Sequence, residues 1–318
     1  MEIIKKGNYV LCSRISEGSH GIVFKIRYNK GTKKLYYAMK VPKSDNVHRE
    51  YLNNEISILR NIEHPNIVKL VDYEIDNYLI LELFKTNCFY LKNPSLSLLK
   101  MIALSILDGL EHLHLECKMV YRDLKPENIL LYSNFDKDKK VALCDFGLSS
   151  RFTNSQINRV GRFLHGTPRY ASINCHLGKC VSYTDDLENL IYVIFYLHKG
   201  SLPWQAYESV STTFLNNNIL IAKQTISAYE LTTNSILANI YDYIVRVNSD
   251  RNLYIKTNAN PEELKKFYFN IRNLLNVLDE KVLSSSIINE TPQEVPIRPV
   301  NRFRKFLKTA KKFLCCGQ

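Results

Sequence analysis

The stretch Tyr121–Leu131 has the sequence YRDLKPENILL, and it decides how the rest of the chain is interpreted. Its first half carries charged side chains around a proline, and its second half is aliphatic. Asp123, Lys125 and Asn128 stand two and three positions apart, directly before a segment, Ile129–Leu131, that we expect to be a buried strand. A strand fixed in a core can hold such a loop and its polar groups still. A solvated surface loop could have the same composition, so the interpretation depends on the motifs around it.

Size and composition indicate a folded protein rather than a disordered or fibrous one. The chain has 318 residues, of which 45% are hydrophobic and 23% are charged. The longest apolar run, Leu190–Leu197, is far shorter than the ~20 residues that a membrane span needs. The first ten residues, MEIIKKGNYV, have no signal-peptide core, and the cysteines form no C-x-x-C pair. We therefore expect an intracellular, cytoplasmic protein with reduced cysteines.

Half of the net charge of +12 is concentrated at the carboxyl end. Residues 301–318 contain lysines and arginines but no acidic residue. A basic total is compatible with nucleic-acid binding, but its concentration in a short tail equally favours a membrane or an acidic partner.

The hydrophobic pattern changes near residue 85. Before it, β-branched and aromatic runs predict about five strands, interrupted by one helix around His48–Arg60. From Ser95 on, apolar residues recur at helical spacing up to Leu113, and further helical patterns fill most of 185–282. Residues 283–300 are polar and rich in proline and serine, which is typical of a linker.

Four further motifs accompany the opening stretch in a fixed order. A glycine-bearing turn, Ile15–Val23, lies between two predicted strands, and glycines allow backbone N–H groups to approach phosphate oxygens. Lys40 ends the third strand and Glu55 follows in the helix; next come the segments HPNIV (residues 64–68) and DFG (residues 145–147). A lysine held by a carboxylate can bind phosphate oxygens, and carboxylate and amide oxygens are the ligands that Mg²⁺ prefers. Together the motifs predict phosphoryl transfer.

In this order the motifs resemble those of a eukaryotic protein kinase, over residues 8–282. The resemblance implies an α+β, bilobal protein kinase fold, with a small antiparallel-sheet N-lobe (about 8–83) that has one main helix. A larger, mostly helical C-lobe would span about 84–282. Lys125 is typical of serine/threonine kinases.

The resemblance also assigns roles. Asp123 is expected to be the catalytic base, with Lys125 beside it reaching the γ-phosphate of ATP. Asn128 and Asp145 are the expected Mg²⁺ ligands. Leu81 falls at the gatekeeper position, followed by the hinge Glu82–Phe84. The expected nucleotide-binding residues are Ile15, Ser16, Glu17, Gly18, Ser19, His20, Gly21, Ile22, Val23, Lys40, Glu55, Glu82 and Leu83.

A narrower resemblance, to the casein kinase I family, covers residues 165–205. It is carried by HGTPRYASIN (165–174), HLG (176–178), DDLE (185–188) and GSLPWQ (200–205). That family has Ser-Ile-Asn, here Ser172–Asn174, where most kinases have Ala-Pro-Glu. By this resemblance Asp186 braces the catalytic loop.

The chain also departs from these families. Ser16 replaces the first glycine of the loop, which lowers nucleotide affinity only if the position needs a positive φ. Tyr183 and Thr184 stand where the family has two arginines that help to bind a phosphorylated substrate, so a weaker preference for such substrates is expected. Family members generally need no activation-loop phosphate, and nothing marks Thr153 or Ser155 as required, so basal activity is expected.

Five residues could suggest a special chemical role but have an ordinary structural interpretation. His112, His114 and Cys117 are close in sequence, but residues two apart do not share a helix face, so packing is favoured over zinc. His20 is interpreted as a solvent-exposed lid residue. Cys144 is interpreted as a small buried residue rather than a nucleophile.

The tail, residues 301–318, combines a basic amphipathic helical pattern with Cys315 and Cys316. It is similar to the tails of casein kinase I members that are lipidated at terminal cysteines, and it predicts attachment of residues 301–316 to the cytoplasmic face of an anionic membrane. A tail helix packed on the large lobe is the alternative, and a nuclear role stays open.

The predicted function is transfer of the ATP γ-phosphate to protein Ser/Thr hydroxyls by a monomer that uses Mg²⁺ and has no direct nucleic-acid ligand. The competing interpretation is a pseudokinase or membrane-associated scaffold that uses the fold for binding only. A nucleic-acid-associated protein acting through the basic tail is a second alternative.

Overall fold

The amino-terminal part of the chain folds as an antiparallel sheet with the order β1-β2-β3-β5-β4. The computed structural model describes residues 9–43, 45–132, 141–157, 159, 166–207 and 212–278. The strands are β1 (Tyr9–Glu17), β2 (Gly21–Lys30), β3 (Lys33–Pro42), β4 (Leu70–Glu74) and β5 (Tyr78–Glu82). About five strands were expected here from the β-branched and aromatic runs, and that prediction is confirmed.

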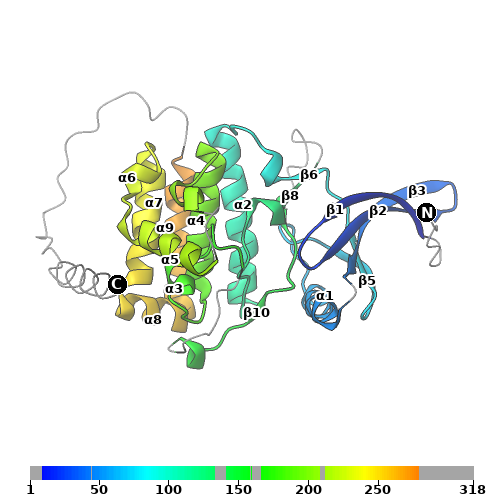
Figure 1. Cartoon of the computed structure of the whole chain (residues 1–318), viewed down its shortest axis with the longest axis horizontal. Coiled ribbons are helices and arrows are strands. Elements are labelled where there is room, and N and C mark those ends of the chain that lie inside the picture. Colours follow the sequence, from blue (N-terminus) through cyan, green and yellow to red (C-terminus); the bar gives the residue numbers. More distant parts are fainter. Residues whose placement is uncertain are drawn as a thin grey trace, which may run out of the picture. The chain divides into compact units, whose positions relative to one another are not determined.

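One helix, α1 (Asn46–Leu59), accompanies this sheet and packs against β3, β4 and β5 (Figure 1). Its first turn is capped by Asp45, whose carboxylate accepts a hydrogen bond from the backbone N–H of His48 at 2.8 Å. Leu52, Ile56 and Leu59 are buried on its inner face. The cap and the apolar face explain why the helix predicted around His48–Arg60 forms here.

The remainder is mostly helical and is built around α2 (Leu96–Leu115), which begins at the N-cap Ser95. The stripe expected from the sequence is fully buried and packs against α4 and α9. It consists of Leu99, Ile102, Ala103, Ile106, Leu107, Leu110 and Leu113.

A second helix, α4 (Tyr183–Lys199), is buried on nearly all sides and ends at Gly200, whose φ of 80° is left-handed. The other helices are grouped around α2 and α4 (Figure 1). They are α3 (Ile173–His176), α5 (Thr212–Thr225), α6 (Ala228–Leu231), α7 (Ser235–Ser249), α8 (Arg251–Ala259) and α9 (Pro261–Asn276). The α+β, bilobal architecture is therefore confirmed.

Short strands and 3-10 helices complete the fold. One sheet has the order β6-β8-β9, with β6 (Thr86–Asn87), β8 (Ile129–Leu131) and β9 (Val141–Leu143). Another pairs β7 (Met119–Val120) with β10 (Ser150–Arg151). The 3-10 helices are η1 (Cys88–Tyr90), η2 (Pro126–Asn128), η3 (Asn154–Gln156) and η4 (Pro203–Tyr207). The buried strand predicted at Ile129–Leu131 is present as β8, and β8, β9 and η2 flank or carry the polar motifs.

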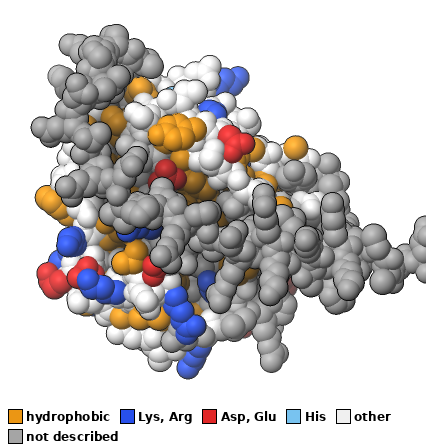
Figure 2. Space-filling view, turned by 90° about the vertical axis from the view of Figure 1, so that its left-hand side faces the viewer, with side chains coloured by type: hydrophobic (Ala, Val, Ile, Leu, Met, Phe, Trp, Pro, Cys, Tyr) orange, Lys and Arg blue, Asp and Glu red, His pale blue; other side chains and the backbone are white. Residues whose placement is uncertain are grey.

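The predicted linker 283–300 and tail 301–318 lie outside the described residues. Within the described ranges, no helix has the length and apolar character that crossing a membrane requires. Figure 2 shows one face, where the coloured hydrophobic, basic and acidic side chains are interspersed.

Candidate active site

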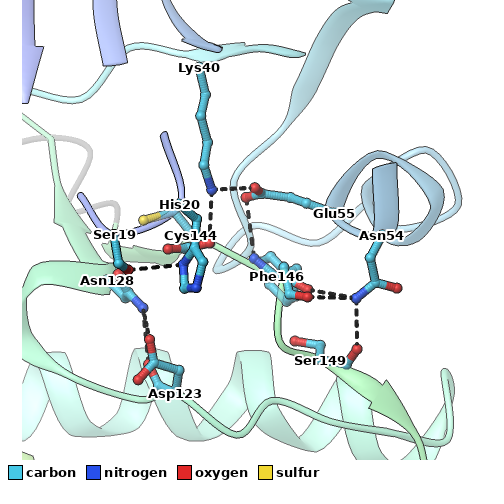
Figure 3. Close-up of polar contacts among 12 residues, drawn as sticks. Ser19, His20, Lys40, Asn54, Glu55, Asp123, Asn128, Cys144, Phe146 and Ser149 are labelled. Carbon is cyan, nitrogen blue, oxygen red and sulfur yellow. Dashed lines mark hydrogen bonds and ion pairs between the residues drawn. The ribbon is translucent and has the colours of Figure 1, made fainter. Parts of the chain in front are cut away.

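Lys40 reaches from β3 to two carboxylates on other elements (Figure 3). Its Nζ lies 2.6 Å from Oε2 of Glu55 on α1 and 2.8 Å from Oδ1 of Asp145, which follows β9. The Glu55 side chain is almost completely buried. The pair expected from the sequence is thus formed, and Asp145 is joined to it.

Burial and charge act in opposite directions on this group. Burial alone would lower the pKa of Lys40, but the carboxylates of Asp145 and Glu55 raise it above the ordinary value of lysine. Burial raises the pKa of Glu55, with a further contribution from Asp145, against the effect of Lys40. Burial would also raise the pKa of Asp145, but the positive charge of Lys40 lowers it. Lys40 is therefore a permanent cation beside an ionised Asp145.

Two side chains of α1 fix the DFG segment. The second carboxylate oxygen of Glu55 accepts a hydrogen bond from the backbone N–H of Phe146 at 3.2 Å. The amide of Asn54 donates to the carbonyl groups of Gly147 and Ser149 at 2.8 and 3.0 Å. Sequence reasoning did not identify Asn54, because a lone asparagine in a helix gives no signal of a contact 93 residues away.

In the stretch Tyr121–Leu131, the side chains of Lys125 and Asn128 both approach Asp123. Lys125 Nζ lies 2.5 Å from Oδ2 of Asp123. The amide nitrogen of Asn128 donates to the carbonyl oxygen of Asp123 at 3.0 Å and approaches its Oδ2 at 3.4 Å. Burial would lower the pKa of Lys125, but the charge of Asp123 outweighs it and raises the pKa. The loop is therefore tied together by its own side chains.

Asp186, on α4, holds the main chain at the start of the stretch Tyr121–Leu131. Its carboxylate accepts hydrogen bonds from the backbone N–H groups of Tyr121 (2.6 Å) and Arg122 (2.8 Å), and it lies 3.0 Å from Nε2 of His114. Arg122 has a φ of 76°, a left-handed conformation that a β-carbon disfavours. The bracing role expected for Asp186 is confirmed by these contacts, which also compensate for the strain at Arg122.

The segment after residue 165 returns to Asp123. Thr167 donates its hydroxyl to Oδ1 of Asp123 at 2.9 Å. Gly166 has a φ of 77°, and a β-carbon there would lie 2.4 Å from the carbonyl oxygen of Arg122. Only glycine fits this approach. The motif HGTP was noted in the sequence, but the contact of Thr167 with Asp123 was not foreseen.

The glycine-bearing loop joins β1 to β2, with Ser16 opposite Val23 and Glu17 opposite Ile22. Ser16 is not among the described residues with positive φ, so serine replaces glycine here without backbone strain. Gly21 does require glycine, because a β-carbon would lie 2.6 Å from the carbonyl oxygen of Val41 in β3.

The tip of this loop carries Ser19 and His20 (Figure 3). The expectation that His20 is solvent-exposed is wrong: the ring is half-buried and packs against Tyr51 of α1, with centroids 4.3 Å apart and ring planes inclined by 49°. Its Nδ1 lies 3.1 Å from the Ser19 hydroxyl. Burial lowers its pKa, as do the charges of Lys40 and Lys125, against the effect of Asp145. No pattern in the sequence indicates this ring contact with α1.

The remaining predicted nucleotide residues lie near the junction of the two parts without joining these networks. Leu81 is buried in β5 opposite Ala38, and Glu82 and Leu83 follow it. The carboxylate of Glu17 pairs with Arg14 and with Lys43 (3.4 Å) and is exposed. Ile15, Ser16 and Glu17 are the last residues of β1 before the loop, and the side chain of Glu17 is engaged in these ion pairs.

The proposed metal ligands are adjacent. The backbone N–H of Cys144 donates to the carbonyl oxygen of Asn128 at 3.0 Å, which places Asp145 beside Asn128. Because the amide nitrogen of Asn128 is directed to Asp123, its amide oxygen is the atom that can face a cation. An amide oxygen and an ionised carboxylate suit a hard divalent cation.

The weaker preference for phosphorylated substrates stays a prediction. Tyr183 and Thr184, on which it depends, are buried at the start of α4, where the Tyr183 ring packs on His114 with centroids 4.8 Å apart. Neither side chain offers a positive charge to a phosphate. Arg122 donates to the Ser150 hydroxyl at 2.8 Å.

The structural interpretations of His114 and Cys144 agree with the contacts observed. His114 is completely buried, and its Nδ1 lies 2.6 Å from the hydroxyl of Tyr268. Among the described residues, no group of three or more histidine, cysteine or acidic side chains is placed so that it could hold a metal ion. Cys144 is half-buried rather than fully buried, and burial raises the pKa of its thiol.

A two-part α+β fold with this lysine–glutamate pair, catalytic loop and DFG segment defines the protein kinase class. The family model described as "Protein kinase domain" matches residues 9–282, and a domain of this family implies use of ATP and a divalent metal ion.

Curated relatives narrow the class. Casein kinase I homolog 2 of Schizosaccharomyces pombe is 28% identical over 237 residues, which are 70% of this chain and 54% of the relative. A protein named "probable casein kinase I homolog" in Encephalitozoon cuniculi is 30% identical over 241 residues, covering 70% of this chain and 73% of the relative. A casein kinase I homolog of Kluyveromyces lactis is 32% identical over 185 residues, 56% of this chain but 32% of the relative. The chain belongs to the casein kinase I family of protein kinases.

Proposed function

We propose that this chain is a serine/threonine protein kinase that transfers the γ-phosphate of Mg·ATP to hydroxyl groups of proteins. The alignments span about half of the S. pombe relative and about a third of the K. lactis one, so activity is inferred here from this chain's own residues. The observation that supports it most directly is the meeting of two networks. Lys40, Glu55 and Asp145 form one, Asp123, Lys125 and Asn128 form the other, and the N–H of Cys144 joins them.

Each group has a chemical role in this proposal. Asp123 orients the acceptor hydroxyl and accepts its proton, while Lys125 compensates for the charge of Asp123 and of the transferred phosphoryl group. Lys40 binds phosphate oxygens, and Glu55 keeps its ammonium group in place. Asn128 and Asp145 would hold Mg²⁺, which supplies charge neutralisation between the phosphates when it is bound.

The side-chain geometry favours an enzyme over a binding-only pseudokinase. An ion-paired Lys40 held by a buried Glu55 is preorganised for phosphate, and Asp123 already accepts a hydrogen bond from the hydroxyl of Thr167. Basal activity without activation-loop phosphorylation is part of this proposal, because Arg122 is held by Ser150.

The test is Asp123→Asn, compared with wild type in peptide phosphorylation and in nucleotide binding by calorimetry. We expect ATP affinity within about threefold of wild type and turnover reduced by at least about 100-fold, because the acceptor loses its base. Unchanged turnover would refute the role of Asp123. A wild-type protein that binds Mg·ATP but phosphorylates no hydroxyl peptide would favour the pseudokinase.

The tail, residues 301–318, is proposed to bind an anionic, cytoplasmic membrane surface, with lipid on Cys315 or Cys316. Basic residues near such a surface each contribute about 1 kcal/mol before screening by salt. Intact-mass measurement of the protein from its own cells tests for the lipid, and vesicle and RNA binding by a tail deletion separates a membrane partner from a nucleic acid.

A further inference from the structure

The segment from Gly166 to Ala171 runs beside the proposed catalytic carboxylate. Thr167 contacts Asp123 at 2.9 Å, and the chain then turns through hydrogen bonds from the N–H groups of Tyr170 and Ala171 to the carbonyl oxygen of Thr167 (3.0 and 3.1 Å). A peptide whose hydroxyl meets Asp123 must place its neighbouring residues against this segment. The shape of residues 166–171 therefore affects how a substrate peptide binds.

Buried donors hold the carbonyl groups of this segment. Lys223, on α5, donates through Nζ to the carbonyl oxygens of Pro168 (3.0 Å) and Ala171 (2.5 Å). The indole N–H of Trp204 donates to the carbonyl oxygen of Arg169 at 2.8 Å. The ring of Trp204 is completely buried and Lys223 is 1% exposed, so both contacts lie inside the core.

Lys223 has a third polar neighbour, Nε2 of His176, at 3.3 Å. Its Nζ also lies 4.7 Å from the ring centroid of Tyr192 and 5.0 Å from that of Trp204. Nε2 of His176 also lies 3.1 Å from the carbonyl oxygen of Pro168. The two carbonyl acceptors and the two aromatic faces match the charged form of the Lys223 side chain, because aromatic faces attract a cation.

A buried ammonium group is costly, and among the described residues no carboxylate is hydrogen-bonded to Lys223. Burial lowers the pKa of Lys223 to about 7, while Glu188 and Cys175 act in the opposite direction. The groups that face it are Cys175 and His176 on α3, Glu188 and Tyr192 on α4, and Trp204 on η4. The hydrogen bonds that Lys223 donates to the carbonyl oxygens of Pro168 and Ala171 explain why an ammonium group is placed in the core.

We propose that Lys223 is a positioning residue for the binding of the protein substrate. By donating from inside the core to the carbonyl groups of Pro168 and Ala171, Lys223 sets the conformation of residues 168–171. It touches neither nucleotide nor acceptor. Its loss therefore weakens the binding of the peptide and leaves the nucleotide network of Lys40 intact.

The experiment compares Lys223→Met with Lys199→Met in the full chain. Lys199 also donates to a main-chain carbonyl, that of Glu230 at 3.1 Å, but it is exposed. For Lys223→Met we expect the KM for a peptide substrate to rise about tenfold, with kcat and the KM for ATP within about threefold of wild type. Lys199→Met is expected to match wild type in all three constants.

A peptide KM within twofold of wild type in a folded Lys223→Met protein overturns the inference, and so does an equal rise in the KM for ATP. Folding is checked by thermal melting. If the variant does not fold, the wild type is assayed from pH 6 to 9 with a peptide that lacks histidine. The peptide KM should then rise above pH 7 as the ammonium group of Lys223 loses its proton and its charge, and a flat profile overturns the inference.

Because the inference rests on the proposed kinase activity, a second measurement separates the two. Hydrogen exchange of the amides of residues 166–176 should be faster in Lys223→Met than in wild type and Lys199→Met. Faster exchange in a chain that phosphorylates nothing would refute the proposed function while leaving the contact with the loop supported. If Lys223→Met is an active enzyme with unchanged hydrogen exchange and an unchanged peptide KM, the positioning role of Lys223 is refuted and the proposed function is not.

Discussion

Lys40 and Lys223 are both buried, but their surroundings differ in a way that separates their roles. Lys40 faces the carboxylates of Glu55 and Asp145, and its side chain keeps 12% exposure. Lys223 faces main-chain carbonyls and aromatic rings and is 1% exposed. Carboxylates raise the pKa of the first lysine, whereas burial lowers that of the second. The comparison teaches that the partners, more than the depth of burial, decide what a lysine contributes.

The two sites also differ in what can replace their partners. The ion pairs of Lys40 can be exchanged for the oxygens of a phosphate, since these carry the same charge. The acceptors of Lys223 are parts of the fold and have no substitute. Lys40 therefore suits a ligand that comes and goes, and Lys223 suits a permanent conformation.

The largest effect should come from removing the first lysine. Lys40→Met should lower kcat/KM by about 100-fold or more, because the charge that stabilises the transferred phosphate is lost. Lys223→Met should change only the KM for the peptide. Initial rates with ATP and peptide varied in turn measure both. Losses of the same size and in the same constant for the two variants would contradict the distinction.

Sequence reasoning predicted one of these sites and missed the other for a physical reason. Lys40, Glu55 and Asp145 belong to local motifs whose order carries information, and the strands and the α2 stripe follow from periodicity. Lys223 stands alone in α5, and its acceptors are more than 50 residues away, at Pro168 and Ala171.

The contacts that could not be predicted are those created by tertiary packing. The hydrogen bonds of Asn54 to the DFG segment, the tilted ring contact of His20 with Tyr51 and the burial of Tyr183 each join distant elements. Pattern and spacing describe one element at a time, so they place residues on faces without showing which other face they meet.

A smaller effect is expected on the stability of the fold in acid, through His176 beside Lys223. Burial and, to a smaller extent, the positive charge of Lys223 together lower the pKa of His176 to about 3. Between about pH 6.5 and 3 the unfolded imidazole binds a proton that the folded one does not, so stability is lost as pH falls. At pH 5 this amounts to about 2 kcal/mol.

Urea unfolding of wild type and His176→Gln at pH 7.5 and 5 measures this contribution. The glutamine variant should lose less stability on acidification than wild type, and Lys223→Met should lie between them because part of the lowering of the pKa comes from the ammonium group. An equal acid loss in all three proteins would show that His176 is already protonated in the fold or accessible to water.

The smallest effect concerns the histidine beside the first lysine. Burial lowers the pKa of His20, and Lys40 and Lys125 contribute in the same direction, while the carboxylate of Asp145 opposes them. Lys40→Met removes one positive charge and leaves Asp145, so the pKa of His20 should rise. Titration by NMR of protein labelled at histidine follows it, with His20→Phe to assign the signal. The signal of His176 should not move in Lys40→Met, since its lysine neighbour is Lys223. A pKa of His20 that is unchanged or falls would mean that the imidazole leaves Tyr51 in solution, and that the loop tip does not sense the charge at Lys40.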